Sequence, residues 1–217
     1  MSLRIGDKAP DFTQDSSVGP LHWYEYQGNN WGIIFSHPAD YTPVCTTELG
    51  EVSKRLAEFE KRNTKVAGLS VDSLARHGTR CPASPTRLTA TEGWIKDINE
   101  TQNTNVTYPI IADHDRKVAK LYGMLDQTNE EAPGLPLTVR AVFIIDPSKI
   151  IRLIIYYPAS TGRNFHEVFR VLDSLQLSAK SVATPANWEP GQDVVVVPSV
   201  PTDKAKEIFG EVKVLHQ

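Results

Sequence analysis

The amino-acid sequence predicts an α/β sandwich, in which helices flank a mixed β-sheet, followed by a small C-terminal appendage. Short continuous apolar runs alternate with segments of helical periodicity, which is the pattern of α/β domains. Two of the apolar runs are separated by only a four-residue turn, so at least one pair of strands is expected to be antiparallel. The last part of the chain carries its own short strand and helix patterns between prolines.

The expected strands are five apolar runs. Continuous apolar runs of this length are typical of central strands that are covered on both faces. The break at Asp146–Lys149 has the composition of a hairpin turn, and it joins the last two runs. In chain order, the strands are predicted at Gly32–Phe35, Val66–Val71, Ile110–Ala112, Val142–Ile145 and Ile150–Tyr157.

Two segments between and after these strands have the apolar spacing of a helix face. The first helix is predicted over Thr46–Arg62, and the second over Phe165–Leu175. The apolar positions of the first are Leu49, Val52, Leu56 and Phe59, and those of the second are Phe165, Val168, Phe169, Leu172 and Leu175.

The remaining segments are a loop and a tail. Arg76–Glu92 is rich in Pro, Thr, Ser and Arg without apolar periodicity, which predicts a surface loop. In the tail, Asp193–Val197 is strand-like and Asp203–Phe209 has a short helical pattern. We predict a main domain over residues 1–178 and an appendage over residues 179–217, packed on the main domain or on a partner subunit.

Composition excludes several classes of protein. The 217 residues are 40% hydrophobic and 23% charged, which suits a soluble globular protein. The net charge of -3 gives no reason to expect binding to nucleic acid or stable association with a membrane. The apolar runs are too short to span a bilayer, and the N-terminus lacks the features of a secretory signal or transit peptide. A cytoplasmic location is therefore expected.

The cysteine and histidine content narrows the chemistry. Cys45 and Cys81 are the only cysteines, too few for a disulfide-rich secreted fold. They do not form a C-x-x-C pair, so a thioredoxin-type dithiol motif is absent. The six histidines are scattered and no cysteine–histidine cluster has zinc spacing, so we expect no metal and no other cofactor.

Cys45 has the setting of a reactive cysteine. Thr42 is a suitable N-cap residue and Pro43 suits the first helical position, which places Cys45 in the first turn of the helix that follows a strand. The unpaired N–H groups and the positive end of the helix dipole favour an anion there, and a thiolate is the reactive form of cysteine. The alternative is a buried structural cysteine that packs as a small hydrophobic residue.

Glu48 complicates this interpretation. It lies three residues after Cys45 on the same helix face, and its carboxylate would disfavour a thiolate. A reactive Cys45 therefore requires cationic help. Arg140 is a candidate because it begins an apolar run, where a permanent charge needs a partner, and Arg163, just before a helix, is another. The alternative is that both arginines are half-exposed structural ions.

The pattern Pro38-x-x-x-Thr42-x-x-Cys45 is the peroxiredoxin signature, and longer segments make the match more specific. The chain resembles the one-cysteine peroxiredoxins over most of its length, including the tail. The matching segments are Trp31–Pro38, Tyr41–Leu49, Gly134–Arg140, Tyr157–Asn164 and Val182–Trp188.

The resemblance implies a thioredoxin-like core, a homodimer and a peroxidase with an antioxidant role. In this subfamily the thiolate of Cys45 would attack a peroxide and become a sulfenic acid. Thr42 and Arg140 would hold the peroxide, and Pro38 would shield the pocket from water. Glu48 and Arg163 would orient Arg140, which explains the carboxylate beside the cysteine, and His37 would be a neighbour in the pocket.

Three positions depart from relatives with further chemistry. Thr184 stands where two-cysteine relatives have a resolving cysteine, so we expect an external thiol or other reductant to regenerate Cys45. We expect Cys81 to be an incidental surface thiol; the alternative, a Cys45–Cys81 disulfide, requires that the loop of Cys81 reach the pocket. Some relatives also hydrolyse phospholipids with a serine and a histidine, but this chain has Asn30 and Tyr24 at those positions, so we expect no such lipase activity.

Two other functions remain open. One is a chaperone-like or signalling protein whose assembled surface matters more than turnover, and the other is a thiol–disulfide oxidoreductase, which the missing C-x-x-C pair disfavours.

Overall fold

A computed structural model describes residues 3–74 and 93–210 of the chain. Its contacts divide the chain into two compact units, Met1–Arg163 and Asn164–Gln217. The predicted loop Arg76–Glu92, which includes Cys81, lies outside the described residues. In the part of the chain that is described, no helix is long and apolar enough to cross a membrane.

A seven-stranded mixed sheet forms the centre of the first unit, with the strand order β2-β1-β5-β4-β3-β8-β9. β3 pairs in parallel with β4, and β4 pairs in parallel with β5, whereas β8 is antiparallel to both β3 and β9. The strands are β1 Thr13–Ser16, β2 Gly19–His22, β3 Trp31–Ser36, β4 Thr64–Ser70, β5 Ile110–Ala112, β8 Arg140–Ile145 and β9 Ile151–Tyr157. This confirms the predicted mixed sheet and all five predicted strands, including the hairpin that joins β8 to β9.

Burial follows the position of each strand in the sheet. β8 is buried at every residue, and β3 and β4 are buried almost throughout, as continuous apolar runs predict. The prediction that Ile150–Tyr157 is a central strand is wrong, because β9 lies at the edge of the sheet and most of its residues are only partly buried. An apolar run alone does not distinguish an edge strand from a central one.

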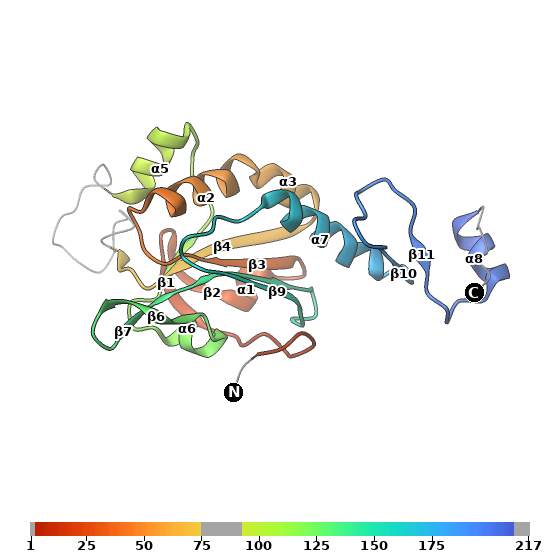
Figure 1. Cartoon of the computed structure of the whole chain (residues 1–217), viewed down its shortest axis with the longest axis horizontal. Coiled ribbons are helices and arrows are strands. Elements are labelled where there is room, and N and C mark those ends of the chain that lie inside the picture. Colours follow the sequence, from red (N-terminus) through yellow and green to blue (C-terminus); the bar gives the residue numbers. More distant parts are fainter. Residues whose placement is uncertain (1–2, 75–92, 211–217) are drawn as a thin grey trace. The chain divides into compact units, whose positions relative to one another are not determined.

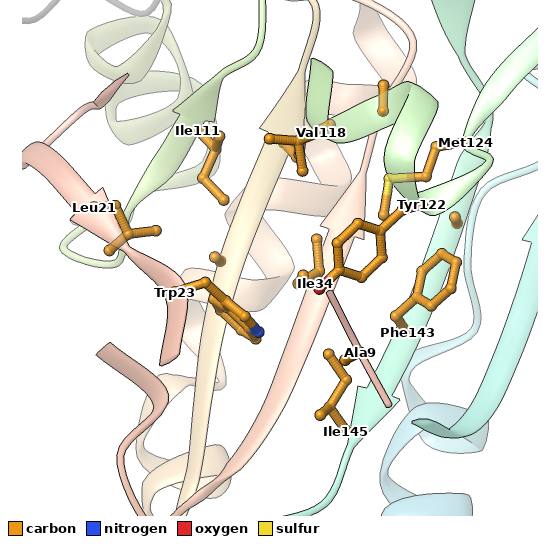
Figure 2. Packing of buried hydrophobic residues seen from close by; sticks show 14 of the residues in the cluster. Ala9, Leu21, Trp23, Ile34, Ile111, Val118, Tyr122, Met124, Phe143 and Ile145 are labelled. Carbon is orange, nitrogen blue, oxygen red and sulfur yellow. The ribbon is translucent and has the colours of Figure 1, made fainter. Parts of the chain in front are cut away.

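Helices cover both faces of this sheet. α1 (Trp23–Gln27) and α6 (Lys117–Tyr122) lie on one side of the sheet. On the other side lie α2 (Pro43–Lys54), α3 (Leu56–Lys61) and α5 (Trp94–Gln102) (Figure 1). The core beneath α1 and α6 is drawn in Figure 2, where Trp23 and Tyr122 face the inward side chains of Ile34 and Phe143. The Tyr122 and Phe143 rings pack edge to face, with their centroids 5.3 Å apart.

The helix predicted over Thr46–Arg62 is two helices in the structure, α2 (Pro43–Lys54) and α3 (Leu56–Lys61). Arg55 separates them with φ -101° and ψ 10°, outside the helical region. The apolar spacing continues across this residue, so the periodicity of the sequence does not reveal the break. α2 also starts at Pro43, as the N-cap and proline signals predict.

Other elements were not predicted from the sequence. β6 (Leu125–Ala132) and β7 (Leu135–Thr138) form an irregular antiparallel hairpin in the first unit. β6 is mostly exposed and polar, and β7 is a four-residue strand that contains Pro136, so neither has the apolar pattern on which strand prediction depends.

The second unit contains the predicted helix at Phe165–Leu175, as α7 (Phe165–Ser178), and a two-stranded sheet of β10 (Val182–Ala183) and β11 (Val195–Val196). The last helix in its described part is α8 (Thr202–Phe209), close to the predicted Asp203–Phe209. The boundary that we predict between residues 178 and 179 remains a prediction.

Candidate active site

A strand, a turn and a helix place Cys45. β3 ends at Ser36, and α2 begins at Pro43 with Thr42 at the N-cap position. Thr46 N–H donates to the Thr42 carbonyl at 3.0 Å, so the N–H groups before it precede the first helical hydrogen bond. The Cys45 side chain thus leaves the helix in its first turn, as predicted.

Thr42 occupies the predicted N-cap position, but its hydroxyl does not cap the helix. The Thr42 Oγ1 hydrogen is donated instead to the Ala39 carbonyl, at 3.1 Å. The oxygen therefore keeps its lone pairs as acceptors. Tyr41, the residue before it, has a left-handed backbone with φ 59°, a conformation that is uncommon for a bulky side chain and recurs at functional sites.

Cys45 is a fully buried free thiol that contacts a guanidinium group. Arg140 Nη1 lies 3.3 Å from Cys45 Sγ, and the Arg140 residue is only 2% exposed. A cation at this distance, in a site shielded from water, stabilises negative charge on the sulfur.

Arg140 is fixed by further contacts of its guanidinium group. Nε and Nη2 both donate to the Ala159 carbonyl, at 3.0 and 2.8 Å, and Nη1 donates to Glu48 Oε2 at 2.6 Å. As the first residue of β8 and the partner of Tyr157 in β9, Arg140 also has a fixed backbone. One Nη2 hydrogen has no acceptor among the described residues, so this guanidinium group keeps a donor for a ligand.

Glu48 binds the Arg140 side chain directly, and Arg163 in turn binds Glu48. Glu48 Oε1 accepts the backbone N–H of Arg163 at 2.8 Å, while Oε2 accepts from the side chains of Arg140 and Arg163 at 2.6 and 2.9 Å. Burial lowers the pKa of Arg163, and the neighbouring Glu48 carboxylate opposes that shift. Each of the two guanidinium groups thus pairs with the same carboxylate, as buried ions require a partner.

His37 belongs to a different buried network. Its Nε2 contacts Asp40 Oδ1 at 2.9 Å, Ser70 Oγ donates to the same oxygen at 3.2 Å, and Asp40 N–H donates to Asp72 Oδ2 at 2.8 Å. Among the described residues, His37 Nδ1 has no hydrogen-bond partner. These contacts orient the imidazole ring, whose centre lies 4.9 Å from that of Trp94.

His37, Asp40 and Asp72 are also the residues that could hold a metal ion. Within the described ranges they form the one group whose potential ligand atoms lie within 4.8 Å of one another. Hydrogen bonds engage His37 Nε2 and one carboxylate oxygen each of Asp40 and Asp72. These bonds orient the three side chains relative to one another.

Trp94 connects α5 to the first turn of α2. Its indole Nε1 donates to Thr46 Oγ1 at 2.9 Å, and that hydroxyl donates to the Thr42 carbonyl at 2.9 Å. Trp94 is fully buried. The helix start that carries Cys45 is therefore tied to a neighbouring helix.

The structure joins four of the predicted residues by direct contacts, namely Cys45, Glu48, Arg140 and Arg163. Pro38, Thr42 and His37 lie in the segment that leads to the same helix, and Pro38 is buried. Sequence reasoning missed Ser36, Asp40 and the Ala159 carbonyl. The first two lie beside the signature residues, but a polar side chain in a strand or turn carries no sign of what it contacts.

Asn30 and Tyr24, which stand at the lipase positions of some relatives, make structural contacts. Asn30 Nδ2 donates to the Gln27 carbonyl at 3.0 Å, and Tyr24 Oη donates to the Ala9 carbonyl at 2.5 Å. Neither residue forms part of a nucleophile–base pair among the described contacts.

Comparisons with known proteins agree with this geometry. Residues 5–154 match the AhpC/TSA family, and residues 174–211 match the C-terminal domain of 1-Cys peroxiredoxin. The chain is 51% identical over 208 residues to a 1-Cys peroxiredoxin of Dictyostelium discoideum, a match that covers 95% of this chain and 79% of the relative. It is 45% identical over 212 residues to human peroxiredoxin-6, covering 95% and 88% of the two chains.

Solved structures are similar over nearly the whole chain. A peroxiredoxin 6 of Arenicola marina, solved as a C45S mutant, is 43% identical with a TM-score of 0.86, covering 99% of this chain and 93% of that one. A yeast mitochondrial 1-Cys peroxiredoxin is 47% identical with a TM-score of 0.82, covering 96% and 93%. The latter was studied for thiol resolution through the glutathione and thioredoxin systems.

Proposed function

Since the chain belongs to the AhpC/TSA family, as a one-cysteine peroxiredoxin, we propose that Cys45 reduces hydrogen peroxide and organic hydroperoxides in an antioxidant role. The protein is a thiol peroxidase, an oxidoreductase that acts on peroxide. The observation that carries the role of Cys45 is its contact with Arg140, at 3.3 Å in a site closed to water.

Charge balance supports a thiolate at this position. Two guanidinium groups, of Arg140 and Arg163, face the single carboxylate of Glu48. With a neutral thiol, the buried group would carry one uncompensated positive charge, which is costly in a site of low dielectric constant. Ionised Cys45 removes the imbalance, so the three charged neighbours together favour the reactive form.

The chemical step follows from these contacts. The Cys45 thiolate attacks the terminal peroxide oxygen, so an S–O bond forms as the O–O bond breaks, and the leaving oxygen takes a proton and departs as water or an alcohol. The remaining Arg140 Nη2 donor stabilises charge on the oxygens as the bond breaks. Thr42 Oγ1, whose hydrogen is directed at the Ala39 carbonyl, accepts the peroxide O–H. Pro38 shields the pocket from water.

Regeneration of Cys45 needs thiols from outside the chain. The sulfenic acid condenses with one external thiol, releasing water and forming a mixed disulfide, and a second thiol then restores Cys45. Thr184, which cannot form a disulfide, supports this proposal, since its hydroxyl instead contacts Ser174 Oγ at 2.6 Å. The yeast relative's link to the glutathione and thioredoxin systems supports these two reductants as the first to test.

The test is stopped-flow oxidation of the reduced protein by hydrogen peroxide and by an organic hydroperoxide, followed by recovery with glutathione or thioredoxin. Cys45→Ser should abolish peroxide consumption. Consumption that survives this substitution would exclude Cys45 as the peroxidatic residue and favour the chaperone-like or signalling role. Reduction of a protein disulfide independent of peroxide would instead favour the thiol–disulfide oxidoreductase.

We also propose that the protein is a cytoplasmic homodimer. The edge strand β9 supports the dimer, because it is the last strand on its side of the described sheet and carries Tyr156, which is 47% exposed, and such edges are usually covered. Sedimentation velocity across a concentration series tests it, and a monomer at all concentrations would contradict it. The requirement for a reduced thiol supports a reducing compartment, and fractionation into cytosol and mitochondria tests the location.

A further inference from the structure

The hydrogen-bond ladder between β3 and β8 stops beside the active site. Its register runs from Gly32 opposite Ile145 to Phe35 opposite Val142. One residue further, Ser36 would face Ala141, but β3 continues instead along β4, where His37 N–H donates to the Leu69 carbonyl at 2.9 Å. The strands β3 and β8 therefore separate at Ser36, next to the start of β8.

The Ser36 hydroxyl bridges β3 and β8 where the two strands separate. It donates to the Val139 carbonyl at 2.6 Å and accepts the Ala141 N–H at 2.9 Å. These are the two peptide groups that adjoin the Cα of Arg140. Ser36 is fully buried, so water does not substitute for its hydroxyl. One side chain thus replaces the backbone pairing on both sides of the arginine that contacts Cys45.

Arg163 also bridges β3 and β8 where the two strands separate. Its Nη2 donates to the Ser36 carbonyl and, at 3.2 Å, to the Ala141 carbonyl. The same guanidinium group binds Glu48, which in turn binds Arg140. Ser36 therefore holds the backbone of Arg140, while Arg163 and Glu48 hold its side chain.

We propose that Ser36 is a positioning residue for the peroxidase reaction, acting through Arg140. The proposal rests on the proposed function, because it assigns Ser36 to the step that Arg140 assists. A displacement of about 1 Å in a reacting geometry can cost about 100-fold in rate. Loss of the hydroxyl would leave the Val139 carbonyl and the Ala141 N–H unpaired in the interior, and the backbone around Arg140 would shift to find other partners.

The test compares two reactions of Cys45 in the full-length protein. Oxidation by hydrogen peroxide needs Arg140 to stabilise the breaking O–O bond, whereas alkylation by iodoacetamide needs only an accessible thiolate. Ser36→Ala should lower the rate constant with peroxide by about 10-fold or more, relative to the alkylation rate constant. Ser36→Thr keeps the hydroxyl and a side chain that suits a strand, so it should restore the ratio of the two rate constants.

Ser16 offers a matched control. Its buried hydroxyl donates to the Gly19 carbonyl at 2.6 Å and accepts the Val18 N–H at 3.3 Å, at the β1–β2 turn. Ser16→Ala therefore removes bonds of the same kind away from Cys45 and should lower stability without changing the ratio. If Ser36→Ala does not fold, the ratio of the two rate constants is compared between Ser36→Thr and Ser36→Val. These two side chains have similar shapes, and only threonine carries a hydroxyl group.

The outcomes separate the proposals. An unchanged ratio in Ser36→Ala, or an equal loss in the Thr and Val variants, would overturn the positioning role. Failure of the parent protein to consume peroxide would instead overturn the proposed function, whatever the Ser36 variants do.

Discussion

Glu48 is the residue on which the two active-site arginines converge. It accepts three hydrogen bonds at 2.6 to 2.9 Å, and its side chain is only 4% exposed. A carboxylate next to a nucleophilic cysteine is unfavourable in isolation. The positive charges of two guanidinium groups exceed the negative charge of this carboxylate. Glu48 therefore holds the two arginines in place and does not suppress the thiolate.

Glu48→Gln should therefore destabilise the protein strongly. The amide would place N–H groups against the N–H donors of Arg140 or Arg163, leaving two buried cations without a carboxylate. Breaking a buried ion pair from one side costs about 3–5 kcal/mol. Urea unfolding of the parent and the variant measures the difference, and the peroxide rate constant should fall as well, because Arg140 loses its support.

The control is Glu51→Gln on the same helix. Glu51 pairs with Lys54 and Arg55, but its side chain is 36% exposed. Pairs of this kind contribute about 0–1 kcal/mol. Equal losses of stability in the two variants would mean that the buried pairing of Glu48 has no special weight.

Residue types and spacing could predict part of this site. Arg140 in an apolar run and Glu48 beside Cys45 were each anomalous in the sequence, and the structure pairs them. Ser36 was not anomalous, because a serine at a strand end is ordinary. Its role depends on the register of β3 against β8 and on the divergence of the two strands, which are tertiary properties.

At the scale of the element, β3 tolerates little extra volume where it passes α1. A Cβ added at Gly32 would lie 2.8 Å from Trp23 Cζ2 and 3.0 Å from Gln27 Cδ, and both of these side chains are fully buried. The glycine is thus required by the close approach of a helix side chain to the strand.

Gly32→Ala should lower the free energy of unfolding by about 1–3 kcal/mol, the usual cost of overpacking a core. Gly68→Ala on β4 is the matched control, since its nearest neighbours, on Ile110 and Leu49, would lie at 3.5 to 3.6 Å. That contact is ordinary, so this variant should be nearly neutral. Thermal or urea unfolding measures the stability of both variants. Similar losses of stability at the two positions would contradict the idea that Trp23 and Gln27 require a glycine at position 32.

Elements were predictable where burial left a pattern. The apolar runs of β3, β4, β5 and β8 predicted strands because the interior excludes polar side chains. β6 and β7 carry no such pattern, and the break at Arg55 leaves the apolar spacing intact. Hairpin pairing and backbone dihedral angles decide these features.

At the scale of the whole molecule, all seven predicted site residues belong to the unit Met1–Arg163. The fold class followed from the alternation of strand and helix patterns, and the thioredoxin-like topology followed from the resemblance. The order of the strands could not be predicted from the patterns alone, because these fix which segments are buried but not which ones pair.

One buried carboxyl group couples the stability of the folded unit to pH. Asp113 is fully buried and accepts the N–H groups of Val118 and Ala119 at the start of α6, at 3.0 and 2.6 Å. Gln14 Nε2 also contacts it, at 3.4 Å. Burial raises the pKa of Asp113 from 3.8 to about 6, the neighbouring Asp115 adds to the rise, and the two backbone N–H groups oppose it.

The sign of the effect follows from proton binding. Between pH 3.8 and about 6, folded Asp113 holds a proton that the unfolded chain has already released. Stability therefore falls as pH rises through this window, and above it the contribution of Asp113 is constant. The loss is at most roughly 3 kcal/mol, from the difference between the two pKa values.

Asp113→Asn removes this titration while keeping a side-chain oxygen for the helix start. Because other carboxylates also titrate in acid, the informative quantity is the difference in unfolding free energy between parent and variant, measured by urea unfolding from pH 4 to 7. The parent should lose stability relative to the variant as pH rises to about 6, and the difference should then level off. A difference that is flat with pH would show that Asp113 is ionised throughout, and that its backbone donors outweigh its burial.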